Sequence, residues 1–375
     1  MKNSLKILFI AMAHMFSILC FSQNFHLLVG TYTNNNSSKG IYVYRFNAAT
    51  GAAEWVSNTE GVVNPSYLVA SPNGKYVYAV NETGGTNPGA VSSFSFDHRS
   101  GQLTYLNSQP SGGDNPCYIT TDKSGKWVVA GNYSGGNLAL FQTLKNGGLQ
   151  PYTQLIQHIG KGVNKERQES PHVHSTVFSP DGNYLFTPDL GLDKVFIYQF
   201  KPTSKKPLIP APQPFVKTGD GNGPRHFTFH PNKKYAYLIE EMSGTVACYK
   251  YSNGRLIFFQ RIATHPADFK GTLGDADIHI SPDGKFLYTS NRGDENAIAI
   301  FSIQSSGKLV WKGYESTLGL TPRNFMIDPT GNFLLVANQK SNSVAIFRRN
   351  LKSGLLRYTG KSIDVPSPVC LQMLK

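Results

Sequence analysis

Five ionisable side chains with complementary chemistry are spread over residues 174–323 of this sequence. They are His174, Arg225, Glu241, Arg292 and Arg323. A carboxylate and an imidazole can move protons, and guanidinium groups can bind an anion or stabilise negative charge that develops on oxygen. The five side chains could therefore catalyse an acid–base reaction, provided that the fold brings them together.

The elements that would position these side chains belong to a phrase that recurs about every fifty residues. Its clearest copy runs from Ser281 to Asn291 and reads SPDGKFLYTSN. Five further copies lie at residues 71–81, 122–132, 179–189, 230–240 and 328–338. A short apolar strand precedes each turn, an alternating strand follows it, and a fourth strand comes after a glycine turn. A period of this length with four strands per unit predicts the blades of a β-propeller.

The ends of the chain complete the count of blades. The third strand of the unit occurs once more, at Gly40–Phe46, ahead of the six phrases. Residues 26–29 resemble a second strand without a first, and residues 367–373 resemble a first strand without a second. We therefore predict an all-β fold, a seven-bladed β-propeller with four antiparallel strands per blade, whose last blade is closed by the N- and C-terminal strands.

The repeat also predicts which side chains share one mouth of the central channel. Adjacent strands are antiparallel, so the start of each first strand lies beside the end of each second strand. The first-strand position is occupied by Ser66, Cys117, His174, Arg225, Ala276, Arg323 and Val369. The second-strand position is occupied by Glu82, Tyr133, Leu190, Glu241, Arg292 and Gln339. The ionisable members fall on the third to sixth phrases in succession, which predicts a site on that arc.

Two interpretations of these polar residues compete. Asn81, Asn132, Asn291 and Asn338 recur at one repeat position and are predicted to be structural, as charged rings that join blades would be. His174, Glu241 and Arg292 differ from their counterparts, as residues of a site do. A second tier lies one or two residues away from the ring positions: His172, Asp189, His226, Glu240, Asp277 and His279.

Longer motifs around these positions resemble a known family. They are residues 30–33 (GTYT), 166–168 with 170–175 (ERQ and SPHVHS), 189–191 (DLG), 223–226 (GPRH), 290–293 (SNRG) and 322–324 (PRN). Over nearly the whole chain the sequence resembles the seven-bladed propeller lactonases, typified by 6-phosphogluconolactonase, with carboxy-cis,cis-muconate lactonizing enzyme as a relative. The resemblance implies a carboxylic ester hydrolase that opens a sugar lactone, 6-phosphogluconolactone or a related aldonolactone.

The resemblance also implies roles for residues. Matching motifs place the catalytic His at His174, the two Arg at Arg225 and Arg292, and the Glu at Glu241, with Glu240 as a less certain alternative. Glu241 would activate water and His174 would carry the proton, although these two roles could be exchanged. Arg225 and Arg292 would bind the oxyanion or an acidic group. Further substrate contacts are assigned to Arg323, Arg167, His172, His226 and Glu240, with Lys165 also at the rim.

The N-terminal residues resemble a secretory signal peptide. Lys2 and Lys6 precede an apolar run from Ile7 to Phe21, which predicts cleavage near Ser22, a mature domain of residues 23–375 and export, for example to the periplasm. The residues before Cys20 argue against lipidation, and no segment is long enough to predict a membrane span. Phosphorylated gluconolactone is a cytosolic metabolite, so export makes an unphosphorylated aldonolactone or another acidic lactone an alternative substrate. An alternative is an exported propeller that binds a ligand or protein without turnover.

The distribution of charge and the absence of several motifs limit which partners and cofactors we expect. The formal charge is +13, or +11 without Lys2 and Lys6. Its Lys and Arg residues are scattered, which argues against nucleic acid and favours a small anionic or sugar ligand. No HExxH, CxxC, P-loop or nucleophile-elbow motif occurs, so we expect no metal or cofactor. Cys117, Cys248 and Cys370 are expected to be buried thiols, and the oligomeric state is left open.

Overall fold

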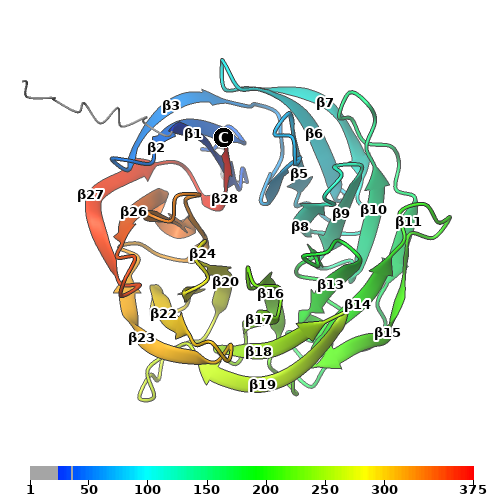
Figure 1. The fold of residues 1–375 in the computed structure, drawn as a ribbon. Coiled ribbons are helices and arrows are strands. Elements are labelled where there is room, and N and C mark those ends of the chain that lie inside the picture. The colour runs from blue at the N-terminus through cyan, green and yellow to red at the C-terminus, as the bar shows by residue number, and fades with distance from the viewer. Residues whose placement is uncertain (1–23, 35–36) are drawn as a thin grey trace, which may run out of the picture.

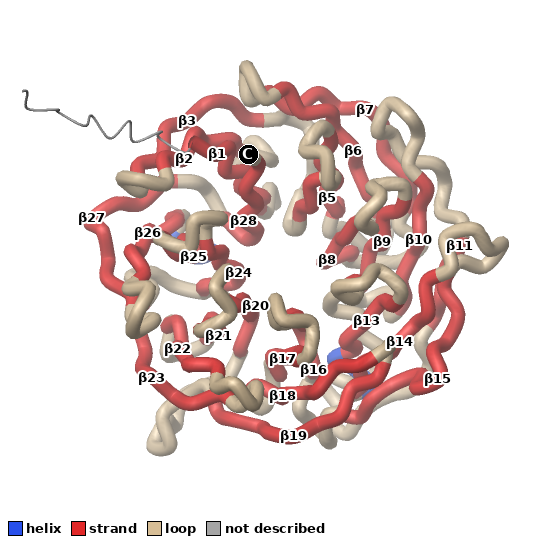
Figure 2. Tube along the Cα trace, in the orientation of Figure 1, coloured by secondary structure: helices blue, strands red, loops and turns tan. Residues whose placement is uncertain are grey.

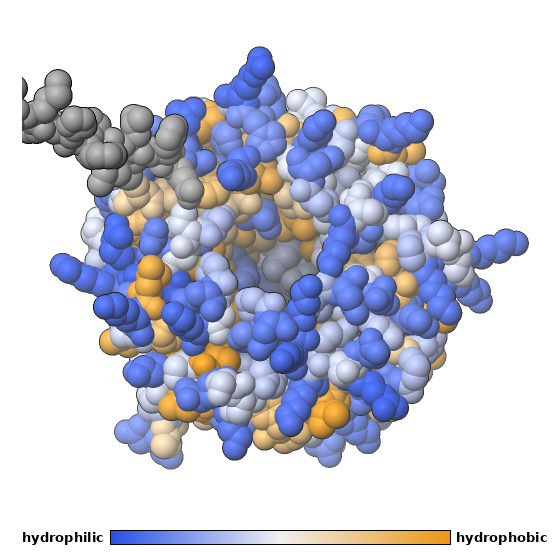
Figure 3. Space-filling view, viewed as in Figure 1, coloured by the Kyte–Doolittle hydropathy of each residue, from blue (hydrophilic) through white to orange (hydrophobic). Residues whose placement is uncertain are grey.

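Seven four-stranded antiparallel sheets are arranged around a central channel in the computed structural model (Figure 1). The structure describes residues 24–34 and 37–375, so the predicted signal peptide lies outside the described residues. Apart from strands and loops, that part of the chain contains only two short 3₁₀ turns, η1 (Leu190–Leu192) and η2 (Gln339–Ser341) (Figure 2). The predicted seven-bladed fold is confirmed, and the ring is hollowed at its centre (Figure 3).

Six blades are built from consecutive strands that follow one another from the channel outward. The first three are β4 (Leu68–Ala70), β5 (Tyr76–Asn81), β6 (Ala90–Asp97), β7 (Gln102–Pro110); β8 (Pro116–Thr121), β9 (Trp127–Asn132), β10 (Asn137–Gln142), β11 (Gln154–Gln157); β12 (Val177–Phe178), β13 (Tyr184–Asp189), β14 (Lys194–Phe200), β15 (Leu208–Lys217). The other three are β16 (Pro224–Phe229), β17 (Tyr235–Glu240), β18 (Thr245–Ser252), β19 (Arg255–Ala263); β20 (Asp275–Ile280), β21 (Phe286–Asn291), β22 (Ala297–Ile303), β23 (Leu309–Ser316); β24 (Pro322–Ile327), β25 (Phe333–Asn338), β26 (Ser343–Arg349), β27 (Leu356–Asp364).

The remaining blade joins the two ends of the described chain. Its order from the channel outward is β28 (Pro368–Leu374), β1 (Asn24–Thr31), β2 (Tyr42–Asn47) and β3 (Ala52–Asn58). Strand β28 pairs antiparallel with β1, with Leu28 opposite Gln372. The predicted closure by the terminal strands is therefore confirmed, and every inner strand gains a partner.

The recurring phrase folds into a turn that its own side chains stabilise. In the Ser281 copy, the Ser281 hydroxyl lies 2.5 Å from an Asp283 carboxylate oxygen and accepts the Phe286 N–H at 3.0 Å. Gly284 has a φ of +71°, a left-handed conformation that glycine adopts without strain. These contacts explain why Ser, Asp and Gly recur, and they show that the phrase connects the first and second strands of a blade.

Apolar side chains on both faces of each sheet fill the spaces between blades. The described residues form seven buried clusters, each between two neighbouring sheets; one of them joins Ile239 and Val246 of one blade to Ile278 and Leu287 of the next. Cys117, Cys248 and Cys370 are buried free thiols, as predicted. Among the described residues, no helix is long and apolar enough to cross a membrane.

Two inner strands are shorter than the repeat predicts. Strand β4 begins only at Leu68, and the preceding Asn64 has a left-handed φ of +43° and contacts Thr33 and the Glu82 carbonyl through its side chain. Strand β12 contains only Val177 and Phe178. The residues before each short strand still make backbone hydrogen bonds to the second strand, such as His174 N–H to the Pro188 carbonyl at 3.0 Å and Glu82 N–H to the Asn64 carbonyl at 3.0 Å.

Candidate active site

A polar cavity of about 240 Å³ opens at one mouth of the channel. Residues from the ends of second strands and the starts of first strands line it, together with one residue from a long connection. They are Tyr32, Glu82, Cys117, Tyr133, Arg167, His174, Glu241, Arg292 and Arg323. The cavity thus gathers side chains from blades all around the ring.

Bulges in the inner strands aim these side chains. The pairing register shifts between Pro116 and Tyr118, between Pro224 and Phe227, and between Pro322 and Asn324. Each shift falls on or beside a predicted ring position, namely Cys117, Arg225 or Arg323. A bulge turns a side chain out of the regular alternation of a strand, so the repeated irregularity points this set of residues toward the channel.

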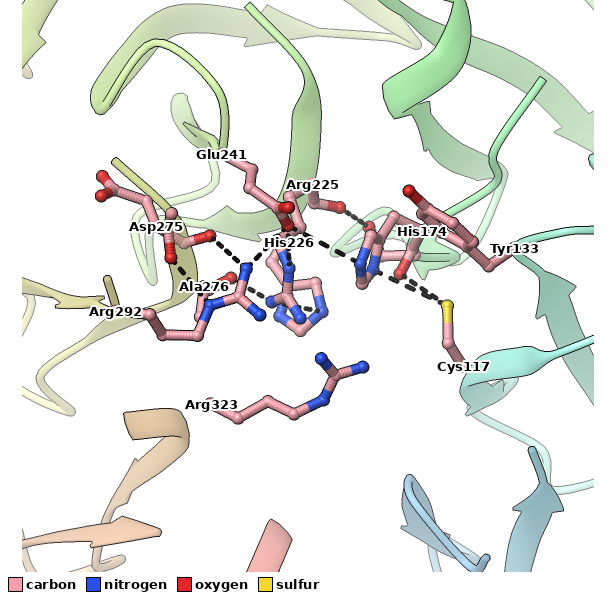
Figure 4. A network of polar contacts seen from close by, with 12 residues as sticks. Cys117, Tyr133, His174, Arg225, His226, Glu241, Asp275, Ala276, Arg292 and Arg323 are labelled. Carbon is pink, nitrogen blue, oxygen red and sulfur yellow. Dashed lines mark hydrogen bonds and ion pairs between the residues drawn. The ribbon is translucent and has the colours of Figure 1, made fainter. Parts of the chain in front are cut away.

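Glu241 is the centre of the charged network (Figure 4). Its Oε1 lies 2.7 Å from Arg167 Nη2, and its Oε2 lies 2.9 Å from both Arg292 Nη2 and Arg225 Nε. The Arg225 contact is an ion pair and not an aligned hydrogen bond. Three guanidinium groups from three separate segments therefore converge on one buried carboxylate.

The pKa values of the network keep it charged. Burial alone would raise the pKa of Glu241, but the positive charges of Arg292, Arg225 and Arg167 lower that pKa to about 2. Burial lowers the pKa of Arg225 to about 10, which still leaves its guanidinium protonated near neutral pH. Glu241 is consequently a carboxylate under all physiological conditions.

His174 lies beside this network as a neutral imidazole. Its Nε2 is 4.0 Å from Glu241 Oε2, and its Nδ1 is 3.7 Å from Cys117 Sγ. Burial, followed by the charge of Arg225, lowers the pKa of His174 well below its usual 6.5. The ring packs edge-on against Tyr133, with centroids 5.2 Å apart. His174 can therefore accept a proton at neutral pH.

The opposite wall carries a less heavily paired guanidinium. The Tyr32 hydroxyl donates to Glu82 Oε2 at 2.9 Å, and the Arg323 guanidinium lies over the Tyr32 ring, 5.6 Å from its centroid. Arg323 Nη2 is 3.9 Å from Glu82 Oε1, the weakest of the cavity's ion pairs to an arginine. Four arginines and two glutamates meet at the site, a formal charge of 4 − 2 = +2, which favours an anionic ligand.

Three residues expected to act at the site lie away from the cavity surface. Arg225 is 1% exposed and lies beneath Glu241. His172 stacks behind Tyr133, and its Nδ1 donates to the Tyr133 carbonyl at 3.0 Å. His226 faces the interior of the channel, where its Nδ1 contacts Asp277.

Glu240 is also absent from the cavity, for a reason that the repeat explains. It occupies the position of the recurring asparagines, whose side-chain amides donate to the preceding interblade loops, as Asn291 does to the Thr264 carbonyl at 2.7 Å. Glu240 instead makes an ion pair with Arg261 at 2.8 Å, fully buried between strands. The structural role predicted for the asparagines is confirmed, and Glu240 shares their position.

Tyr32 is a cavity residue that the repeat did not predict. It follows the end of β1, so it is the counterpart of Glu82 and Tyr133 in the closing blade. That blade lacks the recurring phrase on which the alignment depended. The GTYT motif at residues 30–33 was the available signal.

Comparison with known proteins identifies the family. The model for "Lactonase, 7-bladed beta-propeller" matches residues 26–373. The chain belongs to this family. A 6-phosphogluconolactonase of Formosa agariphila is 41% identical over 351 residues, covering 92% of this chain and 99% of that protein. The 6-phosphogluconolactonase of Bacillus subtilis is 35% identical, covering 92% of this chain and 97% of that protein.

A solved structure of a lactonase-family member is similar throughout. The periplasmic gluconolactonase of Pseudomonas aeruginosa is 39% identical, with a TM-score of 0.90, and the match covers 94% of this chain and 99% of that one. The similar proteins therefore include enzymes named for the phosphorylated and for the unphosphorylated lactone.

Proposed function

We propose that this member of the lactonase family hydrolyses an aldonolactone to the open-chain acid in the cavity around Glu241. The observation that carries the proposal is the pairing of a neutral imidazole with an ionised carboxylate, 4.0 Å apart, among arginines. Hydrolysis needs a group that accepts a proton from water and positive charge where the carbonyl oxygen becomes an anion. The cavity supplies both.

His174 is the better general base of the two. Both oxygens of Glu241 already contact guanidinium groups, which occupy the lone pairs that a base would use. His174 Nε2 takes a proton from the attacking water, and the nearby Glu241 carboxylate stabilises the imidazolium that forms. The same proton then passes to the ring oxygen as the single bond between that oxygen and the carbonyl carbon breaks, which completes the ring opening.

Arg292 and Arg167 are the groups that meet the developing oxyanion. Both line the cavity, and the Arg167 side chain is 45% exposed, in a connection that covers one edge of the mouth. Arg225 is too deeply buried to touch substrate and acts through Glu241. This division differs from the equal roles that the sequence assigned to Arg225 and Arg292.

Arg323 is the proposed contact for an acidic group on the substrate. Its weak pairing leaves donors available, and arginine forms strong charge-assisted hydrogen bonds to phosphate and carboxylate. An anionic lactone, 6-phosphogluconolactone included, fits the positive cavity. An unphosphorylated aldonolactone fits the proposed export of a mature chain of residues 23–375, because it would be met outside the cytoplasm.

The test is hydrolysis of glucono-1,5-lactone and its 6-phosphate by pH-stat titration, corrected for spontaneous opening. We expect His174→Asn, Glu241→Gln and Arg292→Ala to lower kcat by about a hundredfold or more. The matched controls are the exposed His98→Asn, Glu54→Gln and Arg255→Ala, which should keep wild-type rates. Unchanged rates in the cavity variants would refute the site, and no turnover by wild type would favour a binding protein.

A further inference from the structure

Directly beneath the cavity, a buried chain of contacts links Arg225 to Asp277 through His226. Figure 4 shows its first members, Arg225 and His226, below Glu241. Arg225 Nη1 lies 3.3 Å from His226 Nε2, and His226 Nδ1 lies 2.7 Å from Asp277 Oδ1. Arg225 Nη1 also donates to the Ala276 carbonyl. All three side chains are at most 4% exposed and none lines the cavity, so the proposed chemistry does not account for this chain.

The contacts fix the tautomer of His226. Asp277 accepts a hydrogen bond from His226, which places the proton on Nδ1 and leaves the lone pair of Nε2 facing Arg225. Arginine has only donors, so a neutral imidazole in this tautomer is the form that can accept from its guanidinium. Burial, with the charge of Arg225, lowers the pKa of His226 to about 4, which keeps the ring neutral.

Asp277 in turn is held from several blades. It accepts from His279 Nε2 at 2.9 Å and from the Ile278 N–H at 2.9 Å, and it accepts from the Asn324 amide on β24. The Asn324 Oδ1 accepts the Leu371 N–H of β28 at 2.8 Å. The carboxylate is therefore fixed relative to the inner strands of three successive blades, and His226 transmits that position to Arg225.

We propose that His226 and Asp277 are positioning residues that hold the Arg225 guanidinium against Glu241, and so set the place of the carboxylate beside His174. The expected effect on kcat rests on the proposed lactone hydrolysis, whereas the expected position of the Arg225 guanidinium does not. It changes the role expected for His226, from a substrate contact to a support for Arg225.

If the contacts to Asp277 only joined the blades, substitution of His226 and substitution of His279 should have similar effects. Both donate to Asp277, from β16 and from within β20, but only His226 reaches Arg225. His226, Asp277 and His279 all line a second cavity of about 380 Å³ farther along the channel, so contact with Arg225 is what distinguishes the two histidines. The pair of variants His226→Leu and His279→Leu therefore separates positioning from joining of the blades.

Substitutions at His226 can also keep one contact and remove the other. In His226→Gln the amide oxygen can take the place of Nε2 and accept from Arg225. In His226→Asn the amide can take the place of Nδ1 and donate to Asp277, which leaves Arg225 without an acceptor. We expect kcat to fall about tenfold to a hundredfold in the Leu and Asn variants, since a hydrogen bond to a charged group is lost. The His279→Leu variant should stay within about fivefold of wild type, and the Gln variant, which accepts from Arg225 but is no longer held by Asp277, should lose less kcat than the Leu and Asn variants.

The acid side of the pH profile gives a second readout. Below its pKa His226 gains a proton on Nε2 and no longer accepts from Arg225. The other groups facing its ring are Asp277 and His279 of β20, His174 with ring centroids 5.5 Å away, Tyr67 and Tyr118. Protonation of His174 lowers kcat at acid pH in both proteins, so we expect the fall near pH 4 to be steeper in wild type, where His226 is protonated as well, than in His226→Gln. A merely destabilised variant would keep this dependence on pH.

Crystal structures of the Leu variants test the proposal without any turnover. We expect the Arg225 guanidinium to leave Glu241 Oε2 in His226→Leu and to stay in His279→Leu. An unmoved Arg225 in His226→Leu, or equal losses of kcat in the two Leu variants, would overturn the positioning role. If wild type hydrolyses no lactone, the proposed function fails, and the position of Arg225 still decides this inference.

Discussion

Removing the charge of Glu241 should destabilise the fold in a manner that depends on pH. The three surrounding arginines lower the pKa of this carboxyl from 4.5 to about 2 in the folded protein. That difference corresponds to about 3 kcal/mol of folding free energy at neutral pH. Since Glu241 is buried, solvent screens little of it, and Glu241→Gln should lower the free energy of unfolding by about this amount.

The sign of the pH dependence follows from the lowered pKa. The stabilisation is fully present above pH 4.5, where the carboxyl is ionised in both the folded and the unfolded chain. It is lost as the pH falls from 4.5 toward 2, because the unfolded chain then binds the proton first. At pH 3 the difference between wild type and Glu241→Gln should therefore be less than half of its value at pH 7.

Urea denaturation followed by tryptophan fluorescence at pH 7 and pH 3 measures both values. A suitable control is Glu60→Gln, because Glu60 pairs with Lys39 at 3.3 Å on the surface, where both side chains are more than half exposed. An exposed pair of this kind contributes less than about 1 kcal/mol. Equal stabilities of wild type and Glu241→Gln at pH 7, or a difference that persists unchanged at pH 3, would refute the ion-pair reasoning.

Three further results are expected. The pH profile of kcat/KM should be flat from pH 8 to 6.5, because burial lowers the pKa of His174 well below 6.5; a fall that begins above pH 6.5 would exclude His174 as the neutral base. Arg323→Ala should raise KM about tenfold for the 6-phosphate and little for gluconolactone, and equal effects in steady-state assays would argue against phosphate binding there. Arg261→Ala should cost about 2 kcal/mol in urea denaturation with kcat unchanged, since it leaves Glu240 buried and unpaired; a large loss of kcat would return Glu240 to the site.

The repeat made much of the site predictable, because equivalent positions on successive blades must meet at the same mouth. His174, Glu241, Arg292 and Arg323 were selected in this way and line one cavity. The repeat position of Glu240 also indicates a structural role, because other blades carry a structural asparagine there. Motif matching had left Glu240 as an alternative, and repeat position alone would have removed it.

The repeat could not show how deeply each side chain is buried or which side chains surround it. Arg225 occupies a ring position but follows a bulge and is buried under Glu241, so its contacts depend on packing between blades. Tyr32 has no phrase beside it to align, and the choice between Glu241 and His174 as base depends on how many guanidinium groups surround the carboxylate. Each of these features arises from residues far apart in sequence, which no local pattern records.

The strand that closes the ring also sets when the cavity can exist. Strand β28 is the inner strand of a blade whose other three strands precede all the other described blades in the chain, and Tyr32 lies next to the junction of β1 with β28. A growing chain can form the intervening blades one by one, but Tyr32 and Arg323 face each other only after Pro368–Leu374 has been made and inserted. Synthesis of the last seven-residue strand is thus the step that turns a row of sheets into a binding site.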